Sequence, residues 1–118
     1  MIFGIGIDTV DLNRIATLLQ KNDRFLNRIL TAAETSAYRQ LKQTRAIEFV
    51  AGRFAAKEAF SKAYGTGIGP ECSFQDIEIL NTMNGKPIVT HPFELKAFVS
   101  ITHTDTVAMA QVILEERD

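Results

Sequence analysis

Residues 53–62 read Arg-Phe-Ala-Ala-Lys-Glu-Ala-Phe-Ser-Lys and form the centre of the longest helical pattern in the chain. Apolar residues recur at helical spacing from Ile47 onward, and Gly65 is a typical C-terminal stop. The pattern predicts a helix over about residues 44–64. Small residues repeat on one side of it, which favours close packing of the helix against a sheet: Ala51, Ala55 and Ala59.

The residues before this helix predict one strand and two shorter helices. Residues 2–8 are apolar and β-branched with two glycines, which indicates a strand that ends at Asp8. Leucine and isoleucine then recur at helical spacing, with Asp11 as the expected N-cap. Thr31-Ala-Ala-Glu34 has the form of a capping box, so a second short helix should begin there and run to about Gln40.

The residues after the helix predict a β-rich half. A glycine-rich loop covers residues 65–70, and alternation of apolar and polar residues over 75–80 indicates a strand. Asn84-Gly85 is a hairpin turn signal, followed by a return strand. Two further strands are expected over 98–102 and 107–114. The order of strand, helices and strands predicts an α+β fold, with a mostly antiparallel sheet packed against one long and one or two shorter helices.

Length and composition limit the class of protein. The 118 residues, 46% hydrophobic and 23% charged, are expected to form a single domain over 1–118. Apolar stretches fall far short of the roughly 20 residues that span a membrane. The single cysteine, Cys72, cannot form an internal disulfide, which favours a reducing cytoplasm. The net charge of −1 disfavours general nucleic-acid binding.

Charge is distributed unevenly along the chain. Residues 1–62 hold ten Lys/Arg and six Asp/Glu, whereas residues 63–118 hold three and eight. The basic half suits an acidic macromolecule or a phosphorylated ligand. In this half, Phe25 lies among four cations with Asp23 as their only acidic neighbour, and this side is either a solvated face or a dock for an acidic partner helix. The four cations are Arg14, Lys21, Arg24 and Arg28.

The central helix carries the first candidate site. Phe54, Glu58 and Lys62 share one helical face, and Arg53 and Lys57 form a neighbouring basic row. A carboxylate among cations, followed by a glycine loop, is what a phosphate-plus-metal site needs. The alternative is a solvated helix face with a Glu58–Lys62 ion pair worth only about 0.3–0.5 kcal/mol.

Two residues elsewhere could complete such a site. Asp8 ends the first strand after Gly4 and Gly6, where it is either a metal ligand at a sheet edge or simply the start of a turn. Together with Glu58 it would suffice for Mg²⁺, which takes one or two protein carboxylates, but not for Zn²⁺. His103, at a strand end, could contact a phosphate or transfer a proton; otherwise it is a half-buried turn residue.

In their order and spacing these segments resemble the holo-[acyl-carrier-protein] synthases, the small bacterial type of 4′-phosphopantetheinyl transferase. The resemblance covers nearly the whole chain. A Gly-Thr-Gly-Ile-Gly segment directly after the helix adds to it. The segments that carry it are Gly4–Asp8, Arg53–Lys62, Gly65–Gly69, Asn84–Pro87 and Ser100–His103.

The resemblance implies that the 4′-phosphopantetheine arm of coenzyme A, the co-substrate, moves to a serine of an apo acyl carrier protein and releases adenosine 3′,5′-bisphosphate. Asp8 and Glu58 would hold Mg²⁺, with Mn²⁺ as an alternative, and one of them would assist removal of the serine proton. Lys62 would neutralise charge on the diphosphate. The remaining residues would bind the nucleotide: Arg53 and His103 the 3′-phosphate, and the loop with Gly65, Thr66 and Gly67 and the turn Gly85-Lys86-Pro87 the adenosine.

The resemblance also implies partners and context. Carrier proteins are acidic helical domains, so the basic side with Phe25 would be their dock. The family is homotrimeric with sites between subunits, and it serves fatty acid synthesis in the cytoplasm.

Two other functions fit the pattern. One is another Mg²⁺-dependent nucleotide-binding enzyme; the other is a non-catalytic module for acidic helices, which would have no need to pair Asp8 with the Glu58–Lys62 face.

Overall fold

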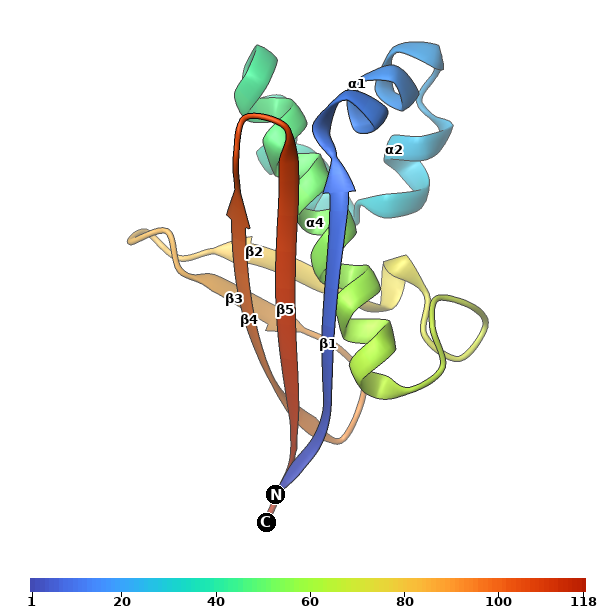
Figure 1. The fold of residues 1–118 in the computed structure, drawn as a ribbon, viewed down its shortest axis with the longest axis vertical. Helices are drawn as coiled ribbons and strands as arrows, with labels where there is room; N and C mark the ends of the chain where they lie inside the picture. The colour runs from blue at the N-terminus through green and yellow to red at the C-terminus, as the bar shows by residue number, and fades with distance from the viewer.

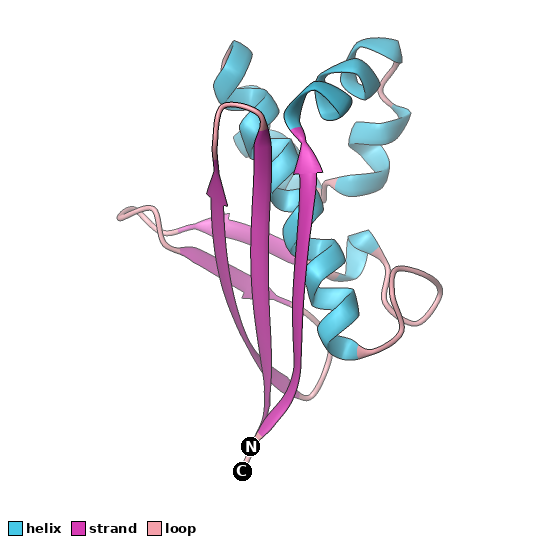
Figure 2. Ribbon diagram, viewed as in Figure 1, coloured by secondary structure: helices cyan, strands magenta, loops and turns pink.

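The computed structural model, which describes residues 1–118, has one long helix lying across a three-stranded antiparallel sheet, with a separate two-stranded hairpin (Figures 1 and 2). None of the helices combines the length and apolar composition that crossing a bilayer would need. The elements are β1 (Ile2–Asp11), α1 (Leu12–Lys21), α2 (Arg24–Ile29), α3 (Ala32–Arg39), α4 (Gln43–Tyr64), the 3-10 helix η1 (Phe74–Asp76), β2 (Glu78–Asn81), β3 (Pro87–Thr90), β4 (Leu95–His103) and β5 (Val107–Glu116).

The main sheet has the order β1-β5-β4, so β1 and β4 are its two edges. The predicted first strand continues three residues past Asp8, because pairing with β5 persists as far as Asp11 opposite Val107. Asp8 and Ile101 both pair with Ala110 of β5, from opposite sides. The fold class predicted from the sequence is confirmed, with three short helices beside α4 rather than one or two.

Helix α4 packs on the inner face of this sheet with almost no side chain between the two backbones. A Cβ on Gly4 would lie 1.9 Å from the carbonyl oxygen of Ala63, and one on Gly6 would lie 1.8 Å from that of Ala59. Only glycine permits this approach. The repeated alanines of α4 are fully buried against the sheet, as their spacing predicted: Ala51, Ala55 and Ala59.

The opposite face of the main sheet is covered by no other element of the chain and faces the viewer in Figure 1. Ile5 and Ile7 of β1 are 60% and 53% exposed on it. Phe98 of β4 and Met109 of β5 continue the same surface, at 54% and 38% exposed. An apolar surface of this kind usually marks a contact with another molecule.

The short helices follow the predicted capping signals only in part. The capping box of α3 forms as expected, because the Glu34 N–H donates to Thr31 Oγ1 at 3.3 Å and the Thr31 N–H donates to Glu34 Oε1 at 2.9 Å. Asp11 occupies the N-cap position of α1, but its side chain makes no capping hydrogen bond. The backbone becomes extended at Asn22, so the docking side is split between α1 and α2.

The strand expected from residue 75 begins only at Glu78. The Asp76 N–H donates to Ser73 Oγ and the Ser73 N–H donates to Asp76 Oδ2, a capping box that closes a 3-10 turn over the first positions of the alternating pattern. Local side-chain hydrogen bonds here outweigh the β pattern. The predicted hairpin turn is present, with Gly85 at φ +85°.

We predict that Gly6→Ala destabilises the protein by about 3 kcal/mol, because the added methyl group would overlap a helix carbonyl that cannot move without displacing α4. Urea unfolding measures the change. Gly69→Ala is the matched control, since a Cβ there meets nothing within 4 Å. Equal stability of Gly6→Ala and the wild type would contradict the packing described here.

Candidate functional site

Asp8, Glu58 and Lys62 meet at the β1 edge of the sheet. Lys62 Nζ donates to Asp8 Oδ1 at 3.0 Å and to the carbonyl oxygen of Ile7 at 3.1 Å. Burial raises the pKa of the Glu58 carboxyl, and the negative charge of Asp8 raises it further, whereas nearby cations oppose the rise. The structure thus brings together all three residues predicted to carry the chemistry. The ion pair of Lys62 is with Asp8, not with Glu58.

The fold explains this convergence. Asp8 lies two residues after Gly6 in β1. Because side chains alternate along a strand, it is on the same face as Gly6. Glu58 and Lys62 are one helical turn apart on α4, whose backbone rests on Gly6. The side chain of Asp8 is 17% exposed and that of Lys62 is 51% exposed, so the cluster opens to solvent beside an edge strand.

The predicted docking cations border the same cluster. The charges of Arg28 and Arg14 both lower the pKa of Glu58, so both lie within electrostatic reach of its carboxylate. Lys21 is the last residue of α1 and Arg24 is the first residue of α2. All four cations are exposed and none forms an ion pair with a carboxylate of this chain.

A pocket of about 520 Å³ lies at the other side of the molecule, between the first half of α4, the β2–β3 hairpin and the end of β4. It brings together four of the residues predicted to bind the nucleotide. Its polar lining combines cations with backbone of the hairpin turn, a set suited to phosphate and sugar groups. The four residues are Arg53, Gly85, Pro87 and His103.

Arg53 is held rigidly at this pocket. Its Nε donates to the carbonyl oxygen of Ile79 at 3.1 Å and its Nη2 to Asn81 Oδ1 at 3.2 Å, while the guanidinium lies 4.0 Å from the centre of the Phe49 ring. Burial lowers the pKa of Arg53 to about 10, with Glu34 opposing the shift. The side chain therefore remains cationic at neutral pH and presents a fixed charge.

Two charged residues of this pocket, Arg45 and Glu48, were not among those predicted from the sequence. Glu48 Oε2 lies 3.6 Å from Nδ1 of His103. Arg45 lies at i−8 from Arg53, near the same helical face, so extending that face by two turns would have found it. Glu48 lies at i−5, on a different side of the helix, and helical spacing from Arg53 does not point to it. They add a cation and a carboxylate to the predicted set.

Not all predicted nucleotide-binding residues gather in this pocket. Lys86 is exposed and does not line it. The glycine-rich loop lies at the far end of α4, whose 22 residues span about 33 Å. There, Thr66 and Gly67 line a separate pocket of about 270 Å³, without Gly65. A single chain therefore does not bring the loop and the Gly85 turn into one adenosine site.

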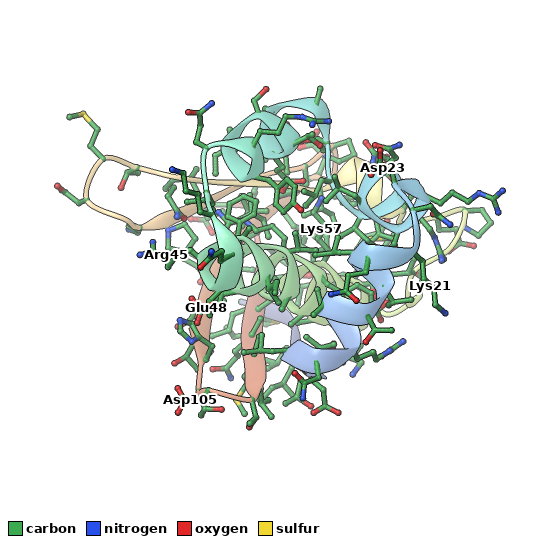
Figure 3. All side chains as sticks on the ribbon, turned by 90° about the horizontal axis from the view of Figure 1, so that it is seen from above. Lys21, Asp23, Arg45, Glu48, Lys57 and Asp105 are labelled. Carbon is green, nitrogen blue, oxygen red and sulfur yellow. The ribbon has the colours of Figure 1, made fainter.

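The two halves of the predicted site lie at opposite edges of the sheet. Asp8 belongs to β1, whereas His103 belongs to β4, with β5 between them. Figure 3 shows the pocket residues Arg45 and Glu48 on one side of the molecule and Lys21, of the docking side, on the other. A single ligand with a diphosphate that contacts both the Asp8 cluster and the pocket must therefore extend across one chain or bind between two chains.

Lys57 does not belong to a basic surface row, which corrects the prediction. It is fully buried, and its Nζ donates to Glu34 Oε1 at 2.6 Å and to the carbonyl oxygens of Ile29 and Phe74 at 2.7 and 3.1 Å. Burial lowers the pKa of Lys57, while Glu34 opposes the shift. In Figure 3 it lies at the centre of the molecule. The ammonium thus joins α2, α3 and η1 to α4 and is unavailable to a substrate.

Comparisons with known proteins agree with this geometry. The family model of the 4′-phosphopantetheinyl transferase superfamily matches residues 4–113. A holo-[acyl-carrier-protein] synthase from Bacillus velezensis is 57% identical over 117 residues, which cover 98% of this chain and 97% of the relative.

Two solved structures show the same fold. A holo-(acyl-carrier-protein) synthase from Bacillus anthracis, in complex with CoA (3′,5′-ADP), superimposes with a TM-score of 0.94 at 54% identity and 99% coverage of both chains. The Helicobacter pylori holo-[acyl-carrier-protein] synthase in complex with coenzyme A gives a TM-score of 0.83 at 34% identity, covering 94% of this chain and 99% of that one. With a matching family model over most of its length and relatives above half identity, this chain belongs to the 4′-phosphopantetheinyl transferase superfamily.

Proposed function

We propose that this chain transfers the 4′-phosphopantetheine arm of coenzyme A to a serine hydroxyl of an apo acyl carrier protein and releases adenosine 3′,5′-bisphosphate. Residues 1–118 would act as one transferase domain in support of fatty acid synthesis. The observation that carries the proposal is the meeting of Asp8, Glu58 and Lys62 at the β1 edge, beside exposed arginines without acidic partners. A module that only binds acidic helices has no use for two carboxylates held together there.

The two carboxylates fit Mg²⁺ or Mn²⁺. Their mutual repulsion contributes to the raised pKa of Glu58, and a divalent cation between them would relieve it. No third His, Cys, Asp or Glu joins them. Magnesium commonly takes one or two protein carboxylates and completes its shell with water and phosphate oxygens. Asp8 and Glu58 would hold the ion, which when bound screens the negative charge of the diphosphate.

Phosphoryl transfer depends mainly on positioning and on charge stabilisation. The carrier serine oxygen attacks the phosphorus that bears the pantetheine arm, and the bond from this phosphorus to the bridging oxygen breaks. The bridging oxygen leaves with the adenosine bisphosphate. Lys62 is exposed enough to turn its ammonium from Asp8 toward a diphosphate oxygen and to stabilise this charge.

The serine proton passes to a carboxylate oxygen of the cluster. Sequence alone does not distinguish Asp8 from Glu58 for this role. Burial and the charge of Asp8 raise the pKa of Glu58 in the chain alone, whereas a divalent cation held by both carboxylates would lower it, so this shift does not select between them. The proton is therefore assigned to the Asp8–Glu58 pair and not to one member of it.

The nucleotide end of coenzyme A would occupy the pocket at the β4 edge. Arg53 and His103 supply groups for the 3′-phosphate, and Arg45 adds a cation that the sequence reasoning did not include. Backbone at Gly85 and Pro87 lines the same cavity without large side chains. A volume of about 520 Å³ suits a nucleotide-sized group.

A homotrimer with sites between neighbouring subunits would unite the two halves. In a ring, each subunit contacts the next through two different surfaces. The β1 edge of one chain can then face the β4-edge pocket of another, and the uncovered apolar sheet face provides surface for burial. In such a trimer, the glycine-rich loop of one chain and the Gly85 turn of another can line the same site.

We predict that the protein, incubated with coenzyme A, Mg²⁺ and apo acyl carrier protein, adds one phosphopantetheine to the carrier, read as a mass increase. Asp8→Asn and Glu58→Gln should each lower the rate about 10²- to 10⁴-fold, because each removes a charge that the transition state requires. Glu94→Gln, at an exposed glutamate far from the cluster, serves as the control. An unchanged carrier mass with the wild type would refute the transferase, and full activity of Glu58→Gln would remove Glu58 from the site.

We also predict that two inactive variants complement each other. Glu58→Gln disables the β1 edge, and Arg45→Ala/His103→Ala disables the pocket. In mixed trimers purified through two different tags, about one third of the sites would combine two intact halves, because each site draws on two subunits and only one of the three neighbour pairs in such a ring has the productive order. Transfer activity should recover to roughly that fraction. No recovery above the sum of the two separate variants would mean that each chain holds a complete site.

A further inference from the structure

Three phenylalanine rings form a continuous row on the docking side of the molecule. Phe25 of α2 and Phe54 of α4 have ring centres 5.8 Å apart, and Phe54 and Phe74 of η1 have ring centres 5.7 Å apart. The rings come from three different elements, so the row connects the docking helix to the long helix and to the core. Phe74 is buried, whereas Phe25 and Phe54 are partly exposed.

Two of the docking arginines lie over this row. The guanidinium of Arg14 is 5.8 Å from the centre of the Phe54 ring, and that of Arg28 is 5.5 Å from the centre of the Phe74 ring. Both distances are within the range of a cation–π interaction. Neither arginine forms an ion pair within the chain. The rings therefore hold two guanidinium groups in place while leaving their charge available.

The backbone under Arg28 is fixed independently of its side chain. The amide Nε2 of Gln75, next to Phe74, donates to the carbonyl oxygens of Asn27 at 3.0 Å, Arg28 at 3.3 Å and Leu30 at 2.8 Å. These carbonyls end α2 and would otherwise lack partners. The η1 segment thus supports α2 through a side-chain amide and supports the Arg28 guanidinium through a ring.

Ordering these arginines in advance has a consequence for binding. An arginine side chain carries about 2 kcal/mol of rotamer entropy, part of which is lost when it binds a carboxylate. A guanidinium already held over a ring loses less when its planar fork makes a bidentate contact. Preorganisation of this kind raises affinity without adding a contact to the partner.

We infer that Phe54 and Phe74 are positioning residues for the docking site: they hold Arg14 and Arg28 in the orientation that captures carboxylates on an acidic helix of the carrier protein. The inference rests on the proposed function, since it names how the same dock recognises its partner. Both arginines also lie within electrostatic reach of Glu58. A helix captured there is held beside the reacting cluster.

The test is a double-mutant cycle on binding of a fluorescently labelled apo acyl carrier protein, read by anisotropy. Phe54→Leu and Phe74→Leu should each raise Kd about twofold to fivefold, the loss that one cation–π contact corresponds to. Phe74→Leu should have no further effect in an Arg28→Gln background, nor Phe54→Leu in an Arg14→Gln background. Phe93→Leu is the matched control, because the Phe93 ring packs against Tyr64 and no guanidinium lies over it.

The cycle separates positioning from general support of the fold. If the rings act only on stability, the same fold-change in Kd appears with and without the arginine, and the inference is overturned. The KM for coenzyme A should stay unchanged in both phenylalanine variants, whereas the KM for the carrier protein rises with Kd. If the wild-type chain binds the carrier protein without modifying it, the proposed transferase function is refuted, and the double-mutant cycle still tests the inference. If the wild-type chain does not bind the carrier protein, the inference is overturned.

Discussion

The direct contact between the backbones of α4 and β1 is the constraint on which the rest of the molecule depends. Gly4 and Gly6 leave no room for a side chain between strand and helix, so α4 can approach at only one place along β1. That approach sets Glu58 and Lys62 opposite Asp8, residues that are 50 and 54 positions apart from it in the chain. A packing requirement of the core thereby fixes the geometry of a charged cluster at its edge.

The same helix serves three purposes on three of its sides. Arg53 faces the pocket beside β4, Lys57 is enclosed in the core with Glu34, and Glu58 and Lys62 face the β1 edge. The buried pair joins the short helices to α4, and breaking such a pair typically costs 3–5 kcal/mol because one charge is left buried alone. Docking side, reacting cluster and nucleotide pocket are therefore held in one rigid frame, although they lie at different edges of the sheet.

The sequence predicts correctly those structural features that depend only on neighbouring residues. The Thr31–Glu34 capping box and the turn at Gly85 form as predicted, because each depends on neighbouring residues alone. The pairing of Asp8 with Glu58 was also predicted, through the resemblance of the chain to its family. Lys57 was wrongly placed on a basic surface because helical spacing does not show which cations find a buried carboxylate. The separation of the glycine-rich loop from the Gly85 turn depends on the length and direction of α4, which local patterns do not contain.

The central claim is that Asp8 and Glu58 share one divalent ion, and binding of Mn²⁺ measured by electron paramagnetic resonance tests it without relying on turnover. In the presence of adenosine 3′,5′-bisphosphate, the wild-type chain should bind one Mn²⁺ per site. Asp8→Asn and Glu58→Gln should each weaken that binding by tenfold or more, about 1.4 kcal/mol, because each removes a charged oxygen ligand. Wild-type affinity for Mn²⁺ in both variants would contradict the account.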